Sequence, residues 1–358
     1  MGKKKVAILF GGRSVEHGVS INSAKNIFEY IDRSRFEPIP IGISTRGAWY
    51  LTTSVSKDIE PGEPLSLSLD AVNPTWKTSG QTIGVDVAFP VLHGTDGEDG
   101  SIQGIFQALS IPMVGTGVLG SSVSMNKLTS KRLLEKANIP VAPFLSCSYA
   151  DRGSLSFESI SELIGLPFMV KATSLGSSVG ISKVKTVEDF LPALEEAFRY
   201  DNQVLIEKYI KGREIECAIL GNDPPEASLP GEIVISDRYE FYTFDAKYVD
   251  NTAVSIEVPA KLAPKVQEQI RDLSIKAYSA LHCEDFARVD VFLSNEGKVY
   301  INEINTIPGF TNSSMYPMMW KERGVSFTDL ITKLIDLCVA RVERSKRVET
   351  DFKSSLKF

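Results

Sequence analysis

The sequence predicts an α/β protein whose N-terminal domain is built on a parallel sheet and whose later part has mixed α+β structure. Early in the chain, apolar strand-like runs alternate with helix-like segments, the pattern of a parallel sheet. Later strand-like runs follow one another across short turns, as antiparallel strands do. The 358 residues, 43% hydrophobic and 23% charged, suffice for two or three domains with sizeable cores.

The N-terminal elements begin with a continuous apolar run, which is typical of a strand covered on both faces. Apolar residues at helical spacing follow, and two more apolar runs complete the pattern. Residues 52–82, rich in Ser, Thr, Pro and Gly, are expected to be irregular surface structure. These patterns predict strands at 5–10, 36–44 and 85–90 and a helix at 17–31.

A second unit is expected to begin near Ser124. Leucines at helical spacing predict a helix that closes at Asn138 and Pro140. The segment 167–184 has the pattern of a strand, a glycine-serine loop and a strand, and a helix is expected at 187–199. Only a short Lys-Gly connection separates apolar runs at 203–210 and 213–221, so we expect these two strands to pair antiparallel.

The third unit contains a long helix, a hairpin and a final helix. Pro264 suits a helix start, and the turn Asn-Glu-Gly joins strands at 286–294 and 298–305. Ser326 opens a last helix with an apolar stripe that we expect to be buried, and the tail beyond has few apolar residues. The expected domains are residues 1–121, 122–206 and 207–342, followed by a loosely ordered tail at 343–358.

Charge and cysteine content exclude several classes of function. The net charge of −6 gives no electrostatic reason to expect a nucleic-acid partner. Five consecutive apolar residues near the N-terminus are too few for a secretion signal or a membrane span, so we expect a cytoplasmic protein without membrane contact. Four widely spaced cysteines without a CxxC pair suggest buried thiols rather than a zinc site.

Polar side chains converge in the predicted hairpin. Because successive strand residues point to opposite faces, Arg288 shares a face with Asp290, and Glu303 shares one with Asn305. Such oxygen ligands suit Mg²⁺ bound together with substrate phosphates. A solvated sheet face is the alternative explanation. The following segment 306–317 contains a Pro-Gly turn that can bring backbone N–H groups near an anion, which favours the metal site.

Two loops could complete a phosphate-binding site. Lys171 precedes a Gly-Ser-Ser loop that can lay backbone amides on phosphate oxygens, although no Lys follows Gly176 as a P-loop requires. The polar-aromatic stretch 240–252 carries Lys247 and Tyr248 and fits a lid. A flexible hairpin tip and an anchored surface loop are the respective alternatives.

The stretch FGGRSVEHGVS at 10–20 offers a glycine pair and Glu16. A dinucleotide-dependent oxidoreductase would need GxGxxG and an acidic residue after the second strand. The chain has GGRSVE, with Ser44 and Thr45 at that strand end, which disfavours this class. Gly11 and Gly12 are better explained by close backbone approach and a turn.

Taken together, these motifs resemble the D-alanine:D-alanine ligase family of the ATP-grasp superfamily. The similarity runs through nearly the whole chain and rests on several motifs in a fixed order. It implies an N-terminal α/β domain followed by central and C-terminal domains that hold ATP between their sheets. The matching motifs are GGRSVEHGVS, HGTDGEDG, VKATSLGSSVG, EKYIKGREIE, FDAKY, ARVD and NEINTIPGFT.

The resemblance implies an ATP site and a metal site. Lys127 and Lys171 would contact phosphates, and Lys247 would reach the γ-phosphate. Two Mg²⁺ ions, with Mn²⁺ as a possible substitute, would be held by Asp290, Glu303 and Asn305. The other expected ATP-binding residues are Gly176, Ser177 and Ser178 in the glycine-serine loop, Glu207, Lys208 and Ile210 at the adenine, and Glu214 at the ribose.

The implied reaction joins two D-alanines in two steps, for peptidoglycan precursor synthesis. The first carboxylate attacks the γ-phosphorus to give D-alanyl phosphate and ADP, and the second amine displaces phosphate. Arg288 and the Gly309 N–H are candidates to stabilise the tetrahedral oxyanion. The residues expected around the amino acids are a triad of Glu16, Ser177 and Tyr248, with His93, Ser314 and Met315 near the substrates.

The resemblance leaves neighbouring activities to weigh. Ligases that form D-alanyl-D-lactate or D-alanyl-D-serine usually lack the Lys-Tyr pair of the lid, which is intact here and favours the dipeptide. A non-catalytic nucleotide sensor would be expected to lack a magnesium ligand, and all three are present. Asn126 stands before Lys127 where family members often have Asp. The family also implies a homodimer formed through the N-terminal domain.

Overall fold

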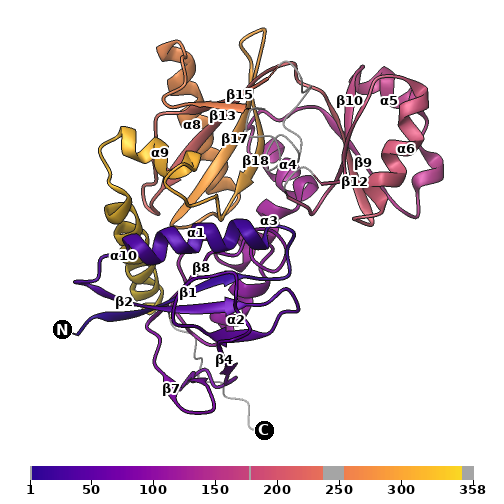
Figure 1. The fold of residues 1–358 in the computed structure, drawn as a ribbon. Coiled ribbons are helices and arrows are strands. Elements are labelled where there is room, and N and C mark those ends of the chain that lie inside the picture. Colours follow the sequence, from indigo (N-terminus) through magenta and orange to yellow (C-terminus); the bar gives the residue numbers. More distant parts are fainter. Residues whose placement is uncertain (1, 177–178, 237–253, 349–358) are drawn as a thin grey trace, which may run out of the picture.

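The computed structural model describes residues 2–176, 179–236 and 254–348. Its larger sheets follow one another along the chain, and Figure 1 shows the second and third side by side above the N-terminal one. In the described ranges, no helix combines the length and the apolar character that crossing a bilayer requires.

The N-terminal sheet has the strand order β4-β3-β2-β1-β8. Strand β1 pairs parallel with β2 and with β8, which confirms the predicted parallel sheet, while β3 and β4 add an antiparallel edge. Helices α1, α2 and α3 belong to this part of the chain. The bounds are β1 Lys4–Gly11, α1 His17–Tyr30, β2 Phe36–Ile43, β3 Trp49–Leu51, β4 Glu63–Pro64, β8 Val87–Pro90, α2 Ser101–Ala108 and α3 Val118–Met125.

Strand β1 is covered on both faces, as its continuous apolar run predicts. Alternate side chains enter different cores: Val6 and Ile8 join the cluster that includes α1, whereas Ala7 and Leu9 join the cluster with α2. At its end, Gly11 has φ +91°, and a Cβ there would lie 2.3 Å from the Ile43 carbonyl oxygen. Only glycine fits this close approach to the neighbouring strand.

The expectation of irregular surface structure at 52–82 was wrong in part. A small antiparallel sheet lies here, formed by β5 (Ser66–Leu67), β6 (Trp76–Lys77) and β7 (Thr82–Ile83). Trp76 is 1% exposed and stacks on Phe106 with ring centroids 6.0 Å apart. A single large aromatic side chain anchors this polar segment to the core, and composition averaged over the segment conceals that contribution.

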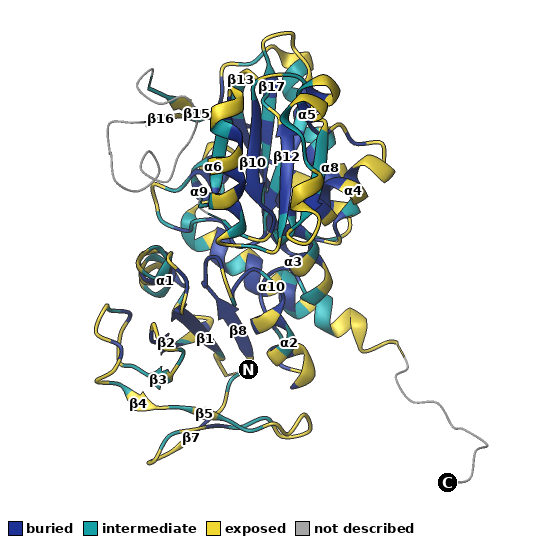
Figure 2. Ribbon diagram, turned by 90° about the vertical axis from the view of Figure 1, so that its right-hand side faces the viewer, coloured by how far each residue is buried: buried dark blue, intermediate teal, exposed yellow. Residues whose placement is uncertain are grey.

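The second sheet has the order β11-β10-β12-β9 and is antiparallel throughout. Helices α5 and α6 pack on it, and in Figure 2 the strands β10 and β12 are buried while these helices expose one side. Its elements, with the preceding helix α4 and the short helix η1, are α4 Lys127–Lys136, β9 Phe144–Ser148, η1 Arg152–Ser154, α5 Phe157–Ile164, β10 Phe168–Ala172, β11 Ile181–Val184, α6 Val187–Phe198 and β12 Gln203–Lys208.

The helix expected from about Ser124 is interrupted at Asn126. This residue ends α3 and is the N-cap of α4, where its side chain accepts a hydrogen bond of 2.9 Å from the Thr129 N–H. Asn and Asp are both good N-cap residues. The departure from the family pattern at this position therefore retains the capping bond.

The third sheet has the order β16-β15-β13-β17-β18, with β14 beside β13. Strands β17 and β18 form the predicted hairpin, and the long helix α8 packs on this sheet. The bounds are β13 Gly212–Leu220, β14 Glu226–Ala227, β15 Gly231–Ile235, β16 Val254–Glu257, α8 Pro264–Ala280, β17 Phe286–Ser294, β18 Val299–Asn305 and α9 Met315–Glu322.

The predicted pairing of the strands at 203–210 and 213–221 was wrong. Strand β12 pairs with β10 and β9 in the second sheet, whereas β13 pairs with β14, β15 and β17 in the third. The two strands bury their side chains in separate cores, Val204 and Ile206 in one and Ile215 and Cys217 in the other. The short connection therefore passes between two sheets rather than forming a hairpin.

The last helix, α10 (Phe327–Ser345), belongs to the core of the N-terminal sheet. Its predicted stripe is buried, with Leu330, Leu334 and Cys338 at 0% exposure. In Figure 1 it runs from the third sheet down to the N-terminal one, and it contacts α1 and β8. The helix continues to Ser345, past the expected start of a loosely ordered tail at 343, and residues 349–358 lie outside the described ranges.

Candidate functional site

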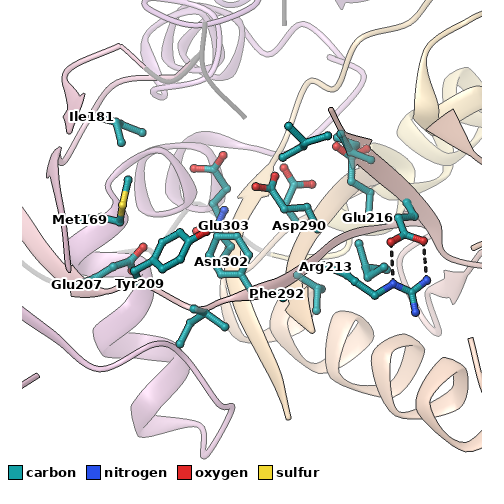
Figure 3. Close-up of a pocket in the computed structure, with 18 of the residues that line it drawn as sticks. Met169, Ile181, Glu207, Tyr209, Arg213, Glu216, Asp290, Phe292, Asn302 and Glu303 are labelled. Carbon is teal, nitrogen blue, oxygen red and sulfur yellow. Dashed lines mark hydrogen bonds and ion pairs between the residues drawn. The ribbon is translucent and has the colours of Figure 1, made fainter. Parts of the chain in front are cut away.

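Two cavities lie where the three sheets meet. The first, of about 360 Å³, lies between the second and third sheets (Figure 3). The second, of about 320 Å³, lies between the third sheet and the N-terminal part of the chain. They share six lining residues, Lys127, Gly176, Glu216, Ile233, Arg288 and Glu303, and so form one continuous site.

Every predicted site residue that the structure describes lines one of these cavities. Four others, Ser177, Ser178, Lys247 and Tyr248, lie outside the described residues. The first cavity is lined by Lys127, Lys171, Gly176, Glu207, Lys208, Ile210, Glu214, Arg288, Asp290 and Glu303. The second is lined by Glu16, His93, Lys127, Gly176, Arg288, Glu303, Asn305, Gly309, Ser314 and Met315.

The hairpin places two carboxylates side by side. In the register of β17 and β18, Asp290 lies opposite Glu303, and Arg288 lies opposite Asn305. Figure 3 shows the two carboxylates in the middle of the first cavity. The register shifts after Asp290, so that Asn302 has no partner across the hairpin and also lines the cavity. The irregularity keeps Glu303 directly across from Asp290.

These carboxylates are neutralised by two cationic side chains, Arg288 and Lys127. Arg288 donates to Asp290 through Nε and Nη2, at 2.6 and 2.7 Å, and its Nε lies 3.1 Å from Glu216 Oε2. Lys127 Nζ lies 3.1 Å from Glu303 Oε2. Like charges directly opposite on neighbouring strands are destabilising unless a cation lies between them. The hairpin thus has the geometry of a cation site.

The donor set fits a hard divalent metal. Two carboxylates and the Asn305 side-chain oxygen are the ligand types that Mg²⁺ prefers when phosphates supply the rest. Asn305 Oδ1 accepts the Ile307 N–H at 3.1 Å, which orients this amide. Within the described ranges, no cluster of three or more His, Cys, Asp or Glu side chains could hold a metal by itself. A metal here would therefore need oxygen ligands from a substrate.

Lys127 is fixed by the start of α4. It is the first residue after the Asn126 cap, and its backbone N–H donates to the Thr173 carbonyl at 2.8 Å. Its ammonium donates to the Leu175 carbonyl at 2.7 Å, next to the glycine-serine loop. The side chain is nearly buried and reaches the boundary between the two cavities. It is placed to contact an anion there.

Glu207 forms a buried cluster with two lysines. Its Oε1 pairs with Lys171, and its Oε2 lies 2.8 Å from Lys131 Nζ as an ion pair without hydrogen-bond geometry. Burial would raise the pKa of Glu207, but the two ammonium groups outweigh it and hold the pKa at about 2. Burial lowers the pKa of Lys131, and Glu207 opposes this shift. The carboxylate stays ionised beside the first cavity.

Side chains of the N-terminal domain hold the segment that contains Gly309. Glu98 Oε1 accepts the Ile307 N–H at 3.3 Å, and His93 Nδ1 donates to the Ile307 carbonyl at 2.7 Å. Ser23 Oγ accepts the Phe310 N–H at 3.1 Å. These three contacts fix the backbone on both sides of Gly309 and so direct its N–H group.

His93 lines the second cavity, but its ring nitrogens face protein groups. Since the Ile307 carbonyl can only accept, Nδ1 carries the proton, and Nε2 accepts from the Ser23 hydroxyl at 3.0 Å. Burial lowers the pKa of His93, so the ring is neutral. This histidine supports the wall of the cavity, and its nitrogens do not point at a substrate.

Glu98 is a second buried carboxyl group, 8% exposed, in the same wall. Its Oε2 accepts the Gly94 N–H at 2.8 Å. Burial, reinforced by the nearby charge of Glu16, raises the pKa of Glu98 to about 8. At neutral pH this group is therefore protonated, and it acts through hydrogen bonds rather than charge.

Sequence reasoning missed Lys131, Glu98 and Ser23. Signals for each were present: Lys131 follows Lys127 by one helical turn, and Glu98 lies inside the HGTDGEDG motif. Ser23 lies two turns after Glu16 on the face of α1 that points into the molecule. Their partners are distant in the sequence, so only the fold identifies them.

Comparisons with known proteins agree on one family. A family model described as "D-ala D-ala ligase N-terminus" matches residues 5–116, and one described as "D-ala D-ala ligase C-terminus" matches residues 133–336. The chain is 47% identical to the D-alanine–D-alanine ligase of Shouchella clausii, over 98% of both chains. It is 43% identical to D-alanine–D-alanine ligase A of Escherichia coli K12, over 98% of this chain and 100% of the relative.

Solved structures give the same result. The D-alanine-D-alanine ligase from Coxiella burnetii superposes with a TM-score of 0.87 and 36% identity, covering 97% of both chains. The VanG D-Ala:D-Ser ligase from Enterococcus faecalis superposes with a TM-score of 0.85 and 35% identity, covering 94% of this chain and 100% of that one. The fold is therefore shared along nearly the full length.

Proposed function

The chain belongs to the D-alanine–D-alanine ligase family, and we propose that its two joined cavities hold ATP and the two D-alanines that it ligates. The protein is an ATP-dependent ligase with the ATP-grasp fold. It forms D-alanyl-D-alanine through a D-alanyl phosphate intermediate, for peptidoglycan precursor synthesis.

The shared wall of the two cavities carries this assignment. Lys127, Arg288 and Glu303 line both cavities, so phosphate-binding and metal-binding groups lie where a nucleotide would meet an amino acid. Transfer of a phosphoryl group to a carboxylate requires this meeting point, because catalysis depends mainly on alignment and charge neutralisation.

ATP would occupy the first cavity. Glu207, Lys208 and Ile210 would contact the adenine, and Glu214 the ribose. Two of the lysines that line the cavity, Lys127 and Lys171, would neutralise phosphate oxygens, as ammonium groups commonly do. Gly176, which lines both cavities, would bring the glycine-serine loop onto the phosphates. Three further residues are assigned to the same phosphates because they match the family motifs: Ser177 and Ser178 in the loop, and Lys247 in the lid.

Two Mg²⁺ ions would be held by Asp290, Glu303 and Asn305, and Mn²⁺ can replace them. When bound, the metal supplies neutralisation of phosphate charge and polarisation of the γ-phosphoryl group. The ion pairs of the hairpin support this placement, because Arg288 and Lys127 already neutralise the carboxylates that would face the metal.

In the first step, the carboxylate of the first D-alanine attacks the γ-phosphorus and ADP leaves. In the second, the amine of the other D-alanine attacks the acyl carbon, and phosphate leaves from the tetrahedral intermediate. Arg288 and the Gly309 N–H would stabilise the oxyanion of that intermediate. The contacts of Ser23, His93 and Glu98 to the flanking backbone support this role for Gly309, since fixed donors need no reorganisation during the reaction.

Glu16 would receive the ammonium group of the first D-alanine. It lines the second cavity, and a Cβ on Gly176 would lie 3.5 Å from Glu16 Oε2, so the backbone at Gly176 approaches this carboxylate. The triad of Glu16 with Ser177 and Tyr248 stays a prediction. Ser314 and Met315, at the start of α9, would contact the second D-alanine.

The assignment is tested by measuring phosphate release from ATP with several amino-acid substrates. We expect release with D-alanine and not with L-alanine, and D-alanyl-D-alanine as the product. D-Serine and D-lactate are offered as second substrates beside D-alanine, because a pocket rejects one extra hydroxyl by only about 10²-fold. Preferential formation of either mixed product would contradict the proposed acceptor, and absence of D-alanine-dependent release would contradict the whole assignment.

We further propose a homodimer formed through the N-terminal domain and a cytoplasmic location, on the strength of the family resemblance and of ATP use. The proposed domains are 1–121, 122–206 and 207–342, with one change: the second boundary belongs after Lys208, because β12 pairs wholly within the second sheet. Light scattering of the purified protein tests the dimer.

A further inference from the structure

Two lysines contact Glu207, and only one of them lines the first cavity. Lys171 extends from β10 and lines the cavity, as does Glu207 on the neighbouring strand β12. Lys131 extends from α4, is 1% exposed and does not line the cavity. The cluster therefore contains one cation that can reach a ligand and one that cannot.

We propose that Lys131 is the permanent counter-ion of Glu207, which frees Lys171 to exchange that carboxylate for a nucleotide phosphate. This inference rests on the proposed function, in which ATP occupies the first cavity. It makes Lys131 a positioning residue, because it touches no substrate and acts through Glu207 and Lys171.

The burial of Glu207 is the physical reason for a second lysine. The carboxylate is 1% exposed, so water cannot replace a lysine that leaves it. An ionised group that is buried without a partner is strongly unfavourable. With Lys171 as the only partner, binding of a phosphate by Lys171 would leave Glu207 uncompensated. Lys131 remains at 2.8 Å and removes that penalty.

A second lysine assigned to the phosphates, Lys127, provides a contrast within the same cavity. Lys127 is also paired with a carboxylate, Glu303, at 3.1 Å. The Glu303 side chain is 29% exposed and lies at the proposed metal site, so water or a metal can take the place of Lys127. No buried cation is needed there. A permanent counter-ion is required only where the carboxylate is fully enclosed.

Glu207 must also remain ionised to recognise a ligand. A carboxylate accepts N–H groups but donates none, whereas a protonated carboxyl group does both. With both lysines in place the pKa of Glu207 is about 2. After Lys171 moves to a phosphate, Lys131 alone keeps the group an acceptor for the adenine amino group. With a ligand that carries phosphates, loss of Lys131 would therefore weaken phosphate and base recognition together, whereas with adenosine Lys171 stays on Glu207 and keeps it ionised.

The test compares a ligand with phosphates and one without. The affinities of Lys131→Met for ADP and for adenosine are measured by titration in the same magnesium buffer. The affinity of the weaker ligand is obtained from its competition with the stronger one. Adenosine does not draw Lys171 away from Glu207, whereas ADP does. We expect ADP affinity to fall between about tenfold and a hundredfold, as for hydrogen bonds to charged groups, and adenosine affinity to change less than about twofold.

Lys136→Met is the matched control, because it removes a lysine from the exposed face of the same helix. We expect both affinities to remain as in the natural protein. Equal weakening of ADP and adenosine by Lys131→Met would assign Lys131 a structural role and overturn the proposal. No effect on either ligand would overturn it as well.

A double variant keeps the test valid if Lys131→Met folds poorly. Lys131→Met combined with Glu207→Gln removes both buried charges, so we expect folding to recover and the ratio of ADP to adenosine affinity to return toward that of the natural protein. A ratio as low as in the single variant would overturn the proposal. If the natural protein binds ADP no better than adenosine, the proposed function fails instead, and the two failures are distinguishable.

Discussion

Replacing Arg341 by methionine should destabilise the protein strongly. Arg341 lies on α10 and donates through Nε and Nη2 to Asp285, at 3.1 and 2.8 Å. The same Nη2 group donates to the Met113 and Gly115 carbonyls, at 2.8 and 3.0 Å. Asp285 also accepts the Gly115 N–H at 2.9 Å. These bonds join α10, the N-terminal sheet and the third sheet at one point.

The magnitude follows from the burial of the acidic partner. The Asp285 side chain is 0% exposed, so removing Arg341 leaves a buried carboxylate without its cation. Such a loss destabilises by about 3 to 5 kcal/mol, a large share of a typical free energy of unfolding of about 5 to 15 kcal/mol. The matched control is Arg344→Met, one turn later. Arg344 pairs with Asp223, but their side chains are 46% and 78% exposed, so we expect a loss of about 0 to 1 kcal/mol.

Chemical denaturation measures both variants. The free energy of unfolding should fall several-fold more for Arg341→Met than for Arg344→Met. Adding Asp285→Asn to Arg341→Met removes the uncompensated charge and should recover part of the loss. Equal losses in the two single variants would refute the argument, and so would a double variant that is less stable than Arg341→Met.

Three other changes test the site. Ser23→Ala removes the acceptor of the Phe310 N–H and should lower kcat about tenfold while the KM for ATP stays near normal, in steady-state assays; an unchanged kcat would contradict the support of Gly309. Glu303→Gln should abolish turnover while circular dichroism shows a folded protein, and near-normal rates would mean that the metal site is misplaced. Burial raises the pKa of Glu98 to about 8, so the folded state favours the protonated form. This stabilisation is complete below about pH 4.5, the ordinary pKa of a glutamic acid, and is lost as the pH rises to about 8. The total loss over this interval is on the order of 5 kcal/mol. The stability of Glu98→Gln relative to the natural protein should therefore rise across that interval in denaturation experiments, and a constant difference would exclude the raised pKa.

Local sequence patterns predicted the elements whose burial follows directly from the spacing of their apolar residues. The apolar run of β1 and the stripe of α10 are both buried as expected. A local pattern does not identify the sheet or helix against which the apolar residues pack. The stripe of α10 does not reveal that it packs on the N-terminal sheet, and the runs at 203–210 and 213–221 do not reveal that they belong to different sheets.

The same limit applies to the site. Carboxylates and lysines in recognisable motifs, such as Asp290 and Lys171, line the cavities as the resemblance implied. Lys131 was missed because lysines are almost never fully buried unless paired, and its partner Glu207 is far away in the sequence. Ser23 was missed because a serine in a helix gives no sign of the backbone N–H that it will accept from Phe310.

The central claim is that ATP activates the carboxylate of the first D-alanine as an acyl phosphate. The most direct measurement uses D-alanine labelled with oxygen-18 in its carboxylate and follows the label by mass spectrometry of the released phosphate. The carboxylate oxygen that attacks the γ-phosphorus should leave with the phosphate, so each dipeptide formed should yield one labelled phosphate. Unlabelled phosphate formed together with D-alanyl-D-alanine would contradict the mechanism.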